Sequence, residues 1–230
     1  MRRSRIRHAA AIVVAAGCLV LGACGAPVTS APHQAASPAP GQVVTAFYGD
    51  SYTRGTGTSA PERRWSSIIA ADRGWWEFNP SVDGLGFVNN RDRLAGSDDL
   101  VDRIVGLRPS PDVVIVTMGL NDAFSMPARA DDIAAAIDAD LDRFRDELPD
   151  ARLIVVEPFW YSDERPEAIE RIIAWVEEAA ERVDADHIPG ASRWLEGHPE
   201  WMAADGIHPD DEGHAEIARR MDEALGRLGL

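Results

Sequence analysis

Short apolar runs alternate with amphipathic stretches along most of this chain, and this alternation limits the possible folds more than any other feature. Three runs, at 43–48, 113–118 and 153–156, have the composition of buried strands. Two weaker runs, at 75–78 and 185–188, have the same character. Strands separated by helices of this length pair in parallel, and a parallel sheet needs helices on both faces.

The segments between these runs carry apolar residues at helical spacing. Such stripes lie within 62–73, 98–107, 133–148, 169–183 and 217–228. The sequence therefore predicts an α/β fold: a three-layer α/β/α sandwich with a parallel sheet of about five strands, formed by residues 43–230. In such sheets ligands bind beyond the carboxyl ends of the strands, so functional residues are expected in the loops that follow them.

The N-terminal residues predict export. Four arginines precede an apolar run at 9–22, which has the length of a signal peptide and is short for a membrane span. The run ends in Leu-Gly-Ala-Cys, which resembles the lipobox of bacterial lipoproteins. That resemblance implies a signal peptide at 1–23 and a lipid on Cys24. A plain secretory signal is the alternative.

Residues 24–42 are predicted to form a flexible, lipid-anchored tether. Between Gly25 and Gln42, 13 of 18 residues are Ala, Pro, Ser or Gly, with no apolar periodicity. We expect the domain to be anchored at the outer face of the cell membrane, or to be secreted. Cys18 leaves with the signal, so the mature chain has no cysteine pair for a disulfide.

The charge of the mature chain argues against one class of partner. Without its four leader arginines the chain has 19 basic and 38 acidic residues, a net charge of −19. Nucleic-acid binding requires a basic surface, so no nucleic-acid partner is expected. We expect a monomer that contacts the membrane only through Cys24.

Polar clusters follow the first three runs and precede the last helical stripe. They are Gly-Asp-Ser-Tyr at 49–52, Asp-Gly-Leu-Gly at 83–86, Gly-Leu-Asn-Asp at 119–122 and Asp-Gly-Ile-His at 205–208. All four are expected at the edge of the sheet where ligands bind. Each motif is common by itself, whereas the ordered set on these elements is specific.

In this order the clusters resemble those of the SGNH (GDSL-type) hydrolases, over essentially all of 43–230. The resemblance implies a flavodoxin-like sandwich and a serine esterase that needs no cofactor or metal. It implies a catalytic triad of Ser51, Asp205 and His208. Its substrate would be a small-molecule, glycan or lipid ester.

The same resemblance implies an oxyanion hole made of the backbone N–H groups of Ser51 and Gly84 and the side-chain amide of Asn121. Gly86 is two residues from Gly84, and both glycines remain candidates for the donor. Such donors stabilise the negative charge that appears on the ester oxygen when it is attacked.

The residue types fit the chemistry. A serine hydroxyl becomes a nucleophile when a base takes its proton, and neutral imidazole suits that task near pH 7. The imidazole needs a carboxylate to orient it, and Asp205 is three residues from His208, a spacing that a turn can close. The chain has no long apolar insertion of the kind that forms a lipase lid, which favours short-acyl or acetylated carbohydrate esters.

Other interpretations stay open on the sequence alone. The loop at 51–58 is rich in Gly and Thr, as in a flavodoxin-like cofactor module. A non-catalytic surface lipoprotein that binds acyl or glycan groups is a further alternative, and acyl transfer to an alcohol would use the same residues as hydrolysis. Trp160 and Tyr161 are candidates for the wall of an acyl pocket. His214 is expected on the surface of the last helix or behind the site.

Overall fold

A computed structural model describes residues 37–94 and 99–230 of the chain. The predicted signal peptide, Cys24 and most of the predicted tether lie outside these residues. Ser37 to Gln42, the end of that tether, contain a turn. The side-chain amide of Gln42 donates a hydrogen bond to the carbonyl of Gly74 in the domain (3.0 Å). Within the described part of the chain, no helix has the length and apolar character needed to cross a membrane.

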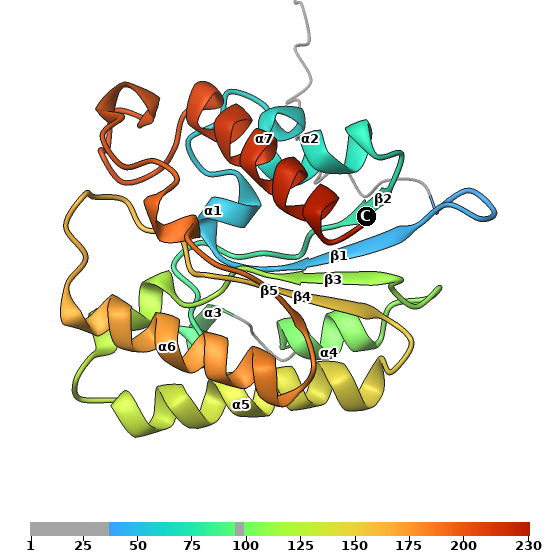
Figure 1. Ribbon diagram of the computed structural model, residues 1–230, viewed down its shortest axis with the longest axis horizontal. Coiled ribbons are helices and arrows are strands. Elements are labelled where there is room, and N and C mark those ends of the chain that lie inside the picture. The colour runs from blue at the N-terminus through green and yellow to red at the C-terminus, as the bar shows by residue number, and fades with distance from the viewer. Residues whose placement is uncertain (1–36, 95–98) are drawn as a thin grey trace, which may run out of the picture. The chain divides into compact units, whose positions relative to one another are not determined.

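A parallel sheet of five strands forms the middle layer (Figure 1), as the sequence predicts. The order across the sheet is β2-β1-β3-β4-β5, and every neighbouring pair is parallel. The strands are β1 (Val44–Tyr48), β2 (Trp76–Phe78), β3 (Val113–Val116), β4 (Arg152–Val156) and β5 (Asp186–Ile188). Because all strands run the same way, their carboxyl ends lie along one edge.

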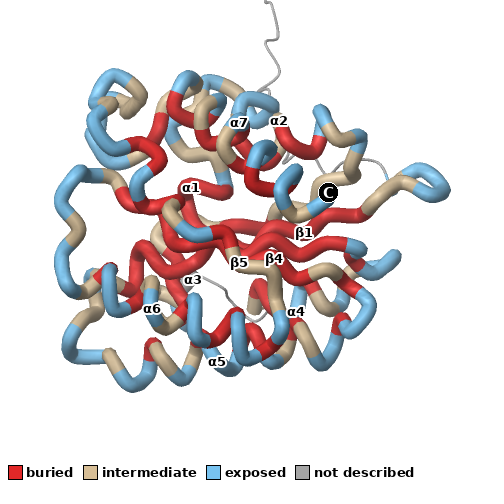
Figure 2. Tube along the Cα trace, viewed as in Figure 1, coloured by how far each residue is buried: buried red, intermediate tan, exposed pale blue. Residues whose placement is uncertain are grey.

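The central strands are mostly apolar because helices cover both faces. Every residue of β1 and β3 is buried. Figure 2 shows this burial as a continuous layer through the sheet and the inner faces of the helices. The weaker strands β2 and β5 lie at the two edges, where pairing on one side explains their fainter apolar pattern.

Two groups of helices form the outer layers (Figure 1). The helices α1 (Ser51–Arg54), α2 (Trp65–Asp72) and α7 (Asp211–Arg227) lie on one face. The helices α3 (Arg91–Leu94), α4 (Leu100–Val105), α5 (Ala130–Glu147) and α6 (Glu167–Arg182) lie on the other. Short 3₁₀ helices are η1 (Pro61–Arg63), η2 (Leu120–Ser125), η3 (Ala191–Arg193) and η4 (Pro199–Trp201). The predicted three-layer sandwich is confirmed.

Two predicted helices are shorter than their apolar stripes. The helix expected at 62–73 begins at Trp65, because the preceding residues form η1, with a proline in its first turn. The helix expected at 98–107 is limited to α4, whose first turn is capped by the carboxylate of Asp99. The start of α4 is therefore set by a side-chain cap, whereas α2 begins where η1 ends, without a side-chain cap on Arg64.

His214 lies in the interior, so the expectation of a surface position is wrong. It is fully buried in the first turn of α7, where that helix packs against α2. Its Nδ1 atom accepts a hydrogen bond from the backbone N–H of Trp65, and its Nε2 atom lies 3.4 Å from the carbonyl oxygen of Thr56. Burial lowers the pKa of His214 to about 4.

We predict that His214 makes folding sensitive to acid. Because its pKa is about 4 in the folded chain and 6.5 as a free group, the unfolded chain binds the extra proton between these values. The contribution to stability is therefore complete above pH 6.5 and is lost as the pH falls toward 4. Urea unfolding of wild type and His214→Gln between pH 4 and 7.5 should give a shallower pH slope for the variant. Identical slopes would contradict the prediction.

Candidate active site

Ser51 occupies the first position of α1, directly after β1. The side chain of Asp50 caps this helix, and Gly49 makes the sharp turn possible, because a Cβ atom there would overlap the hydroxyl of Thr53. Ser51 is only 4% exposed, yet within the described chain its hydroxyl has no hydrogen-bond partner. The turn therefore presents an unengaged hydroxyl at the carboxyl edge of the sheet.

Asp205 and His208 form the pair that their spacing predicts. The Nδ1 atom of His208 lies 2.7 Å from Oδ2 of Asp205. The other carboxylate oxygen accepts the backbone N–H groups of Ile207 (2.9 Å) and His208 (3.0 Å), which closes the turn. The hydrogen bond with His208 lowers the pKa of Asp205 to about 2, so this carboxylate is ionised at neutral pH.

Tyr52 joins the serine helix to the histidine turn. Its hydroxyl donates a 2.6 Å hydrogen bond to the carbonyl of Ile207, and its ring centroid lies 6.1 Å from that of His208. Burial raises the pKa of Tyr52 well above its usual value, so the hydroxyl remains a donor. The structure thus brings Ser51 and His208 together through their chain neighbours. Their own hydroxyl and imidazole are not hydrogen-bonded to each other.

Asn121 connects two of the other clusters. Its amide nitrogen donates to the carboxylate of Asp50 (3.2 Å) and to the carbonyl of Leu85 (2.9 Å). These partners stand immediately before Ser51 and immediately after Gly84. The side chain is 8% exposed, and it comes from η2, directly beyond the end of β3. The predicted oxyanion residues therefore meet at one place.

The two candidate glycines differ in what their N–H groups do. The N–H of Gly86 donates to the carbonyl of Asn89 (2.9 Å). The N–H of Gly84 has no partner among the described residues, and its φ of 72° belongs to the left-handed region that favours glycine. Its carbonyl is held by the side-chain amides of Asn89 (3.1 Å) and Asn90 (3.0 Å). Gly84 is therefore the glycine with a free donor.

Asp122 organises this loop, a role that the sequence analysis missed. Its fully buried carboxylate accepts the backbone N–H groups of Phe87 (2.7 Å), Val88 (2.9 Å) and Asn89 (3.0 Å). A Cβ atom at Gly86 would overlap that carboxylate, which explains the second glycine. The sequence does contain a signal for this role. Asp122 is an acidic residue that closely follows a buried strand, where a charged group requires several hydrogen-bond donors.

Asp50 is a buried carboxyl group beside the nucleophile position. It is 1% exposed, and burial raises its pKa to about 7, with a smaller contribution from the charge of Asp122. Its two oxygens receive the backbone N–H of Tyr52 (3.0 Å) and the amide of Asn121. Asp50 thus links the serine helix to the side chain from the end of β3.

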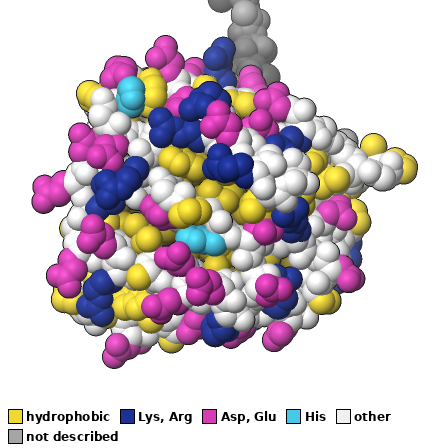
Figure 3. Space-filling model, in the orientation of Figure 1, with side chains coloured by type: hydrophobic (Ala, Val, Ile, Leu, Met, Phe, Trp, Pro, Cys, Tyr) yellow, Lys and Arg dark blue, Asp and Glu magenta, His cyan; other side chains and the backbone are white. Residues whose placement is uncertain are grey.

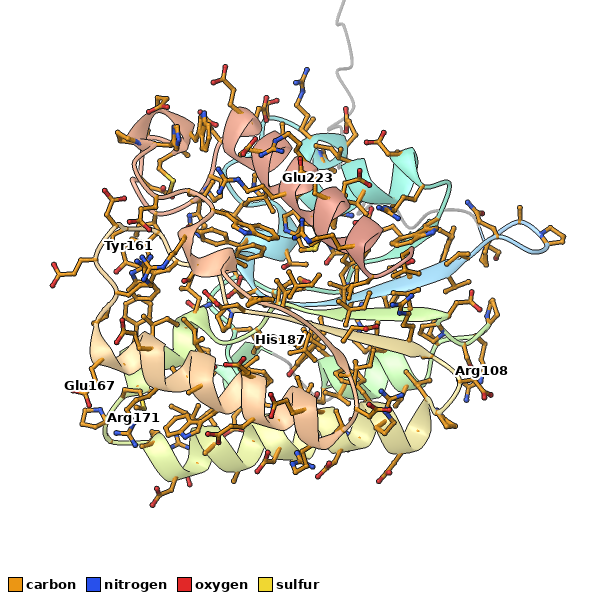
Figure 4. The ribbon with its side chains drawn as sticks, viewed as in Figure 1. Arg108, Tyr161, Glu167, Arg171, His187 and Glu223 are labelled. Carbon is orange, nitrogen blue, oxygen red and sulfur yellow. The ribbon has the colours of Figure 1, made fainter. Side chains whose placement is uncertain are left out.

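Trp160 and Tyr161 follow β4 and lie close together, with ring centroids 4.6 Å apart. Trp160 is buried, and its indole N–H donates to the carbonyl of Glu164 (2.9 Å). Tyr161 is partly exposed at the carboxyl edge of the sheet (Figure 4). Within the described residues, no group of three or more His, Cys, Asp or Glu side chains is arranged to hold a metal ion.

Comparisons with known proteins agree with this geometry. Residues 47–216 match the model of the GDSL-like lipase/acylhydrolase family. The chain is also 28% identical over 183 residues to the GDSL lipase Rv0518 of Mycobacterium tuberculosis. The aligned region covers 76% of this chain and 78% of that protein.

Solved structures with the same fold include two esterases. The psychrotrophic esterase EstA from Pseudoalteromonas sp., inhibited by monoethylphosphonate, matches with a TM-score of 0.62 and 15% identity, over 80% of this chain and 97% of EstA. A family two carbohydrate esterase from Cellvibrio japonicus matches with a TM-score of 0.65 and 18% identity, over 81% of this chain and 61% of that protein. The chain belongs to the GDSL-like lipase/acylhydrolase family and is a hydrolase of that family.

Proposed function

We propose that the protein hydrolyses carboxylic esters through an acyl-enzyme on Ser51, with His208 as general base and Asp205 as its orienting carboxylate. The observation that supports this most strongly is the hydrogen bond from Tyr52 to Ile207. It holds the Asp205–His208 pair beside the helix that begins with Ser51, although these segments are far apart in the chain.

In the proposed reaction the Ser51 hydroxyl attacks the ester carbonyl while His208 takes its proton at Nε2. Asp205, ionised because of its low pKa, stabilises the imidazolium that forms. His208 then returns the proton to the leaving alcohol, and the acyl group remains on Ser51. Water, activated by the same imidazole, releases the acid and restores the serine. Because Ser51 and His208 are not yet hydrogen-bonded, a small movement of the imidazole would accompany substrate binding.

The negative charge on the ester oxygen would meet three donors: the N–H groups of Ser51 and Gly84 and the amide of Asn121. The N–H of Gly84 is free, whereas that of Gly86 is occupied, and this favours Gly84. The amide of Asn121 already has two acceptors. The longer of these hydrogen bonds, to Asp50 at 3.2 Å, is the one that the substrate oxygen would replace.

The loop at 51–58 supports hydrolysis over a flavodoxin-like cofactor site. A Cβ atom at Gly57 would overlap the carbonyl oxygen of Pro209, and a Cβ atom at Gly55 would overlap the side chain of Arg64. The glycines therefore serve close packing of this loop against the histidine turn and α2.

Short-acyl esters, including acetylated carbohydrates, are the proposed substrate class. The absence of a lid-like insertion in the sequence supports small substrates, and one structure with the same fold is a carbohydrate esterase. A non-catalytic acyl- or glycan-binding protein would have no need for an ionised Asp205 paired with His208.

Replacement of Ser51 by alanine should reduce kcat/KM for p-nitrophenyl acetate at least about 10³-fold, because the triad acts as a unit. A reactive ethylphosphonate ester should phosphonylate Ser51 of the wild type with loss of its leaving group, which adds the mass of the phosphonyl group, and it should not label Ser51→Ala. Ser59→Ala is the control: it removes a hydroxyl just beyond the loop at 51–58, which makes an exposed hydrogen bond with Asp211 (2.6 Å), and it should retain activity and labelling. Equal activity in wild type and Ser51→Ala would refute the mechanism.

Removal of the amide at position 121 should lower kcat more than it raises KM. An oxyanion donor acts mainly in the transition state, so we expect Asn121→Ala to lose about 10²–10³-fold in kcat. Steady-state kinetics on the same ester measures both constants. A rise in KM with unchanged kcat would show that Asn121 binds substrate without stabilising the transition state.

We also propose that a lipid on Cys24 anchors the domain to the outer face of the cell membrane, on the basis of the leader and the Leu-Gly-Ala-Cys sequence. Cys24→Ser should move the protein from the membrane fraction to the soluble fraction of cells that express the full chain. Cys18→Ser, inside the leader, is the matched control and should leave the protein in the membrane fraction. Continued membrane association of Cys24→Ser would refute the anchor.

A further inference from the structure

Two large apolar side chains stand out in the described part of the chain because they are exposed. Phe124 is 63% exposed and Ile207 is 44% exposed. Phe124 is three residues from Asn121, and Ile207 is adjacent to His208. A single exposed apolar side chain is common, but here each of the two is close in sequence to a residue of the proposed site, which suggests that they contact substrate. On the face drawn in Figure 3, charged side chains are spread over much of the surface, with apolar groups between them.

The geometry of η2 places Phe124 relative to Asn121. In a 3₁₀ helix, residues three apart lie on the same side. Asn121 is nearly buried and contacts Asp50, whereas Phe124, one turn later, extends into solvent. The phenyl ring therefore continues outward from the place where Asn121 would hold the ester oxygen.

The backbone of Ile207 is anchored at both its N–H and its carbonyl. Its N–H donates to the exposed carboxylate of Asp205, and its carbonyl accepts from the buried Tyr52. With both main-chain groups engaged, the side chain is left exposed beside His208 in the sequence. The hydrogen bonds that build the catalytic turn also fix the direction of this side chain.

The two sides of a bound ester are not equivalent. His208 must protonate the leaving oxygen, so the alcohol portion lies toward the histidine turn and Ile207. The carbonyl oxygen would lie at the oxyanion donors, and the acyl chain would extend away from the leaving oxygen, toward η2, the element that carries both Asn121 and Phe124. Each residue would therefore contact a different part of the substrate.

We propose that Phe124 is a specificity residue that contacts an aliphatic acyl chain and, within the short-acyl class, makes butanoyl or hexanoyl esters better substrates than acetyl esters. This inference narrows the proposed substrates toward short-chain esters and away from acetylated carbohydrates. Ile207 makes the corresponding contact with an apolar alcohol. This inference depends on the proposed function of Ser51. A methylene group that leaves water for an apolar contact favours binding by about fourfold, so a few methylenes against one ring give a measurable preference.

The test compares p-nitrophenyl acetate, butanoate and hexanoate with wild type, Phe124→Ala and Phe124→Leu. The ratio of kcat/KM for hexanoate to that for acetate should fall about tenfold in Phe124→Ala, mainly through KM, and should largely recover in Phe124→Leu. Arg108→Ala removes an exposed side chain from the opposite edge of the sheet (Figure 4) and should leave the ratio unchanged.

A second series, methyl, butyl and hexyl acetate, separates the two residues. Ile207→Ala should weaken the preference for longer alcohols and leave the acyl ratio intact, and Phe124→Ala should do the reverse. An equal fall on all esters, or an unchanged ratio, would overturn the proposal. An unchanged ratio with weaker binding to lipid vesicles, or with loss of a dimer, would assign the ring to a membrane or a second copy. Failure of Ser51→Ala to abolish activity would instead refute the proposed function.

Discussion

One hydrogen bond, from the hydroxyl of Tyr52 to the carbonyl of Ile207, links the beginning and the end of the domain at its active site. The nucleophile position belongs to a short helix after β1, and the histidine belongs to a turn before α7. Neither segment is long enough to hold the other in place by itself. Because the tyrosine is buried and its hydroxyl stays protonated, this bond, together with the contacts of His214 with Trp65 and Thr56, holds the two halves of the proposed triad near each other.

Buried carboxylates organise the rest of the site. Asp122 fixes the loop that carries Gly84 by accepting three backbone N–H groups, and Asp50 receives both the serine helix and Asn121. Farther from the site, Asp140 receives Arg91 and the hydroxyl of Tyr48. Burial alone would raise the free energy of each charge, so each is stable only with its donors in place. These acids make the positions of the loops depend on one another.

The contacts that build the proposed site also bear on the two exposed apolar residues. The backbone of Ile207 is engaged by Asp205 and by Tyr52, and Asn121 reaches Asp50 from η2. Phe124 and Ile207, each close in sequence to one of these anchored residues, remain exposed. In the proposed reaction they would be available to bind the apolar parts of an ester.

Periodicity and local spacing were sufficient to predict the five strands, the layers and the closing turn of Asp205 and His208, because these depend on residues close together in the chain. The motif order also located Ser51, Gly84 and Asn121 at one edge of the sheet. The burial of His214, the loop contacts of Asp122 and the Tyr52–Ile207 bond were decided by tertiary structure alone. Each depends on which distant segment packs alongside, and that packing leaves no periodic signal in the sequence.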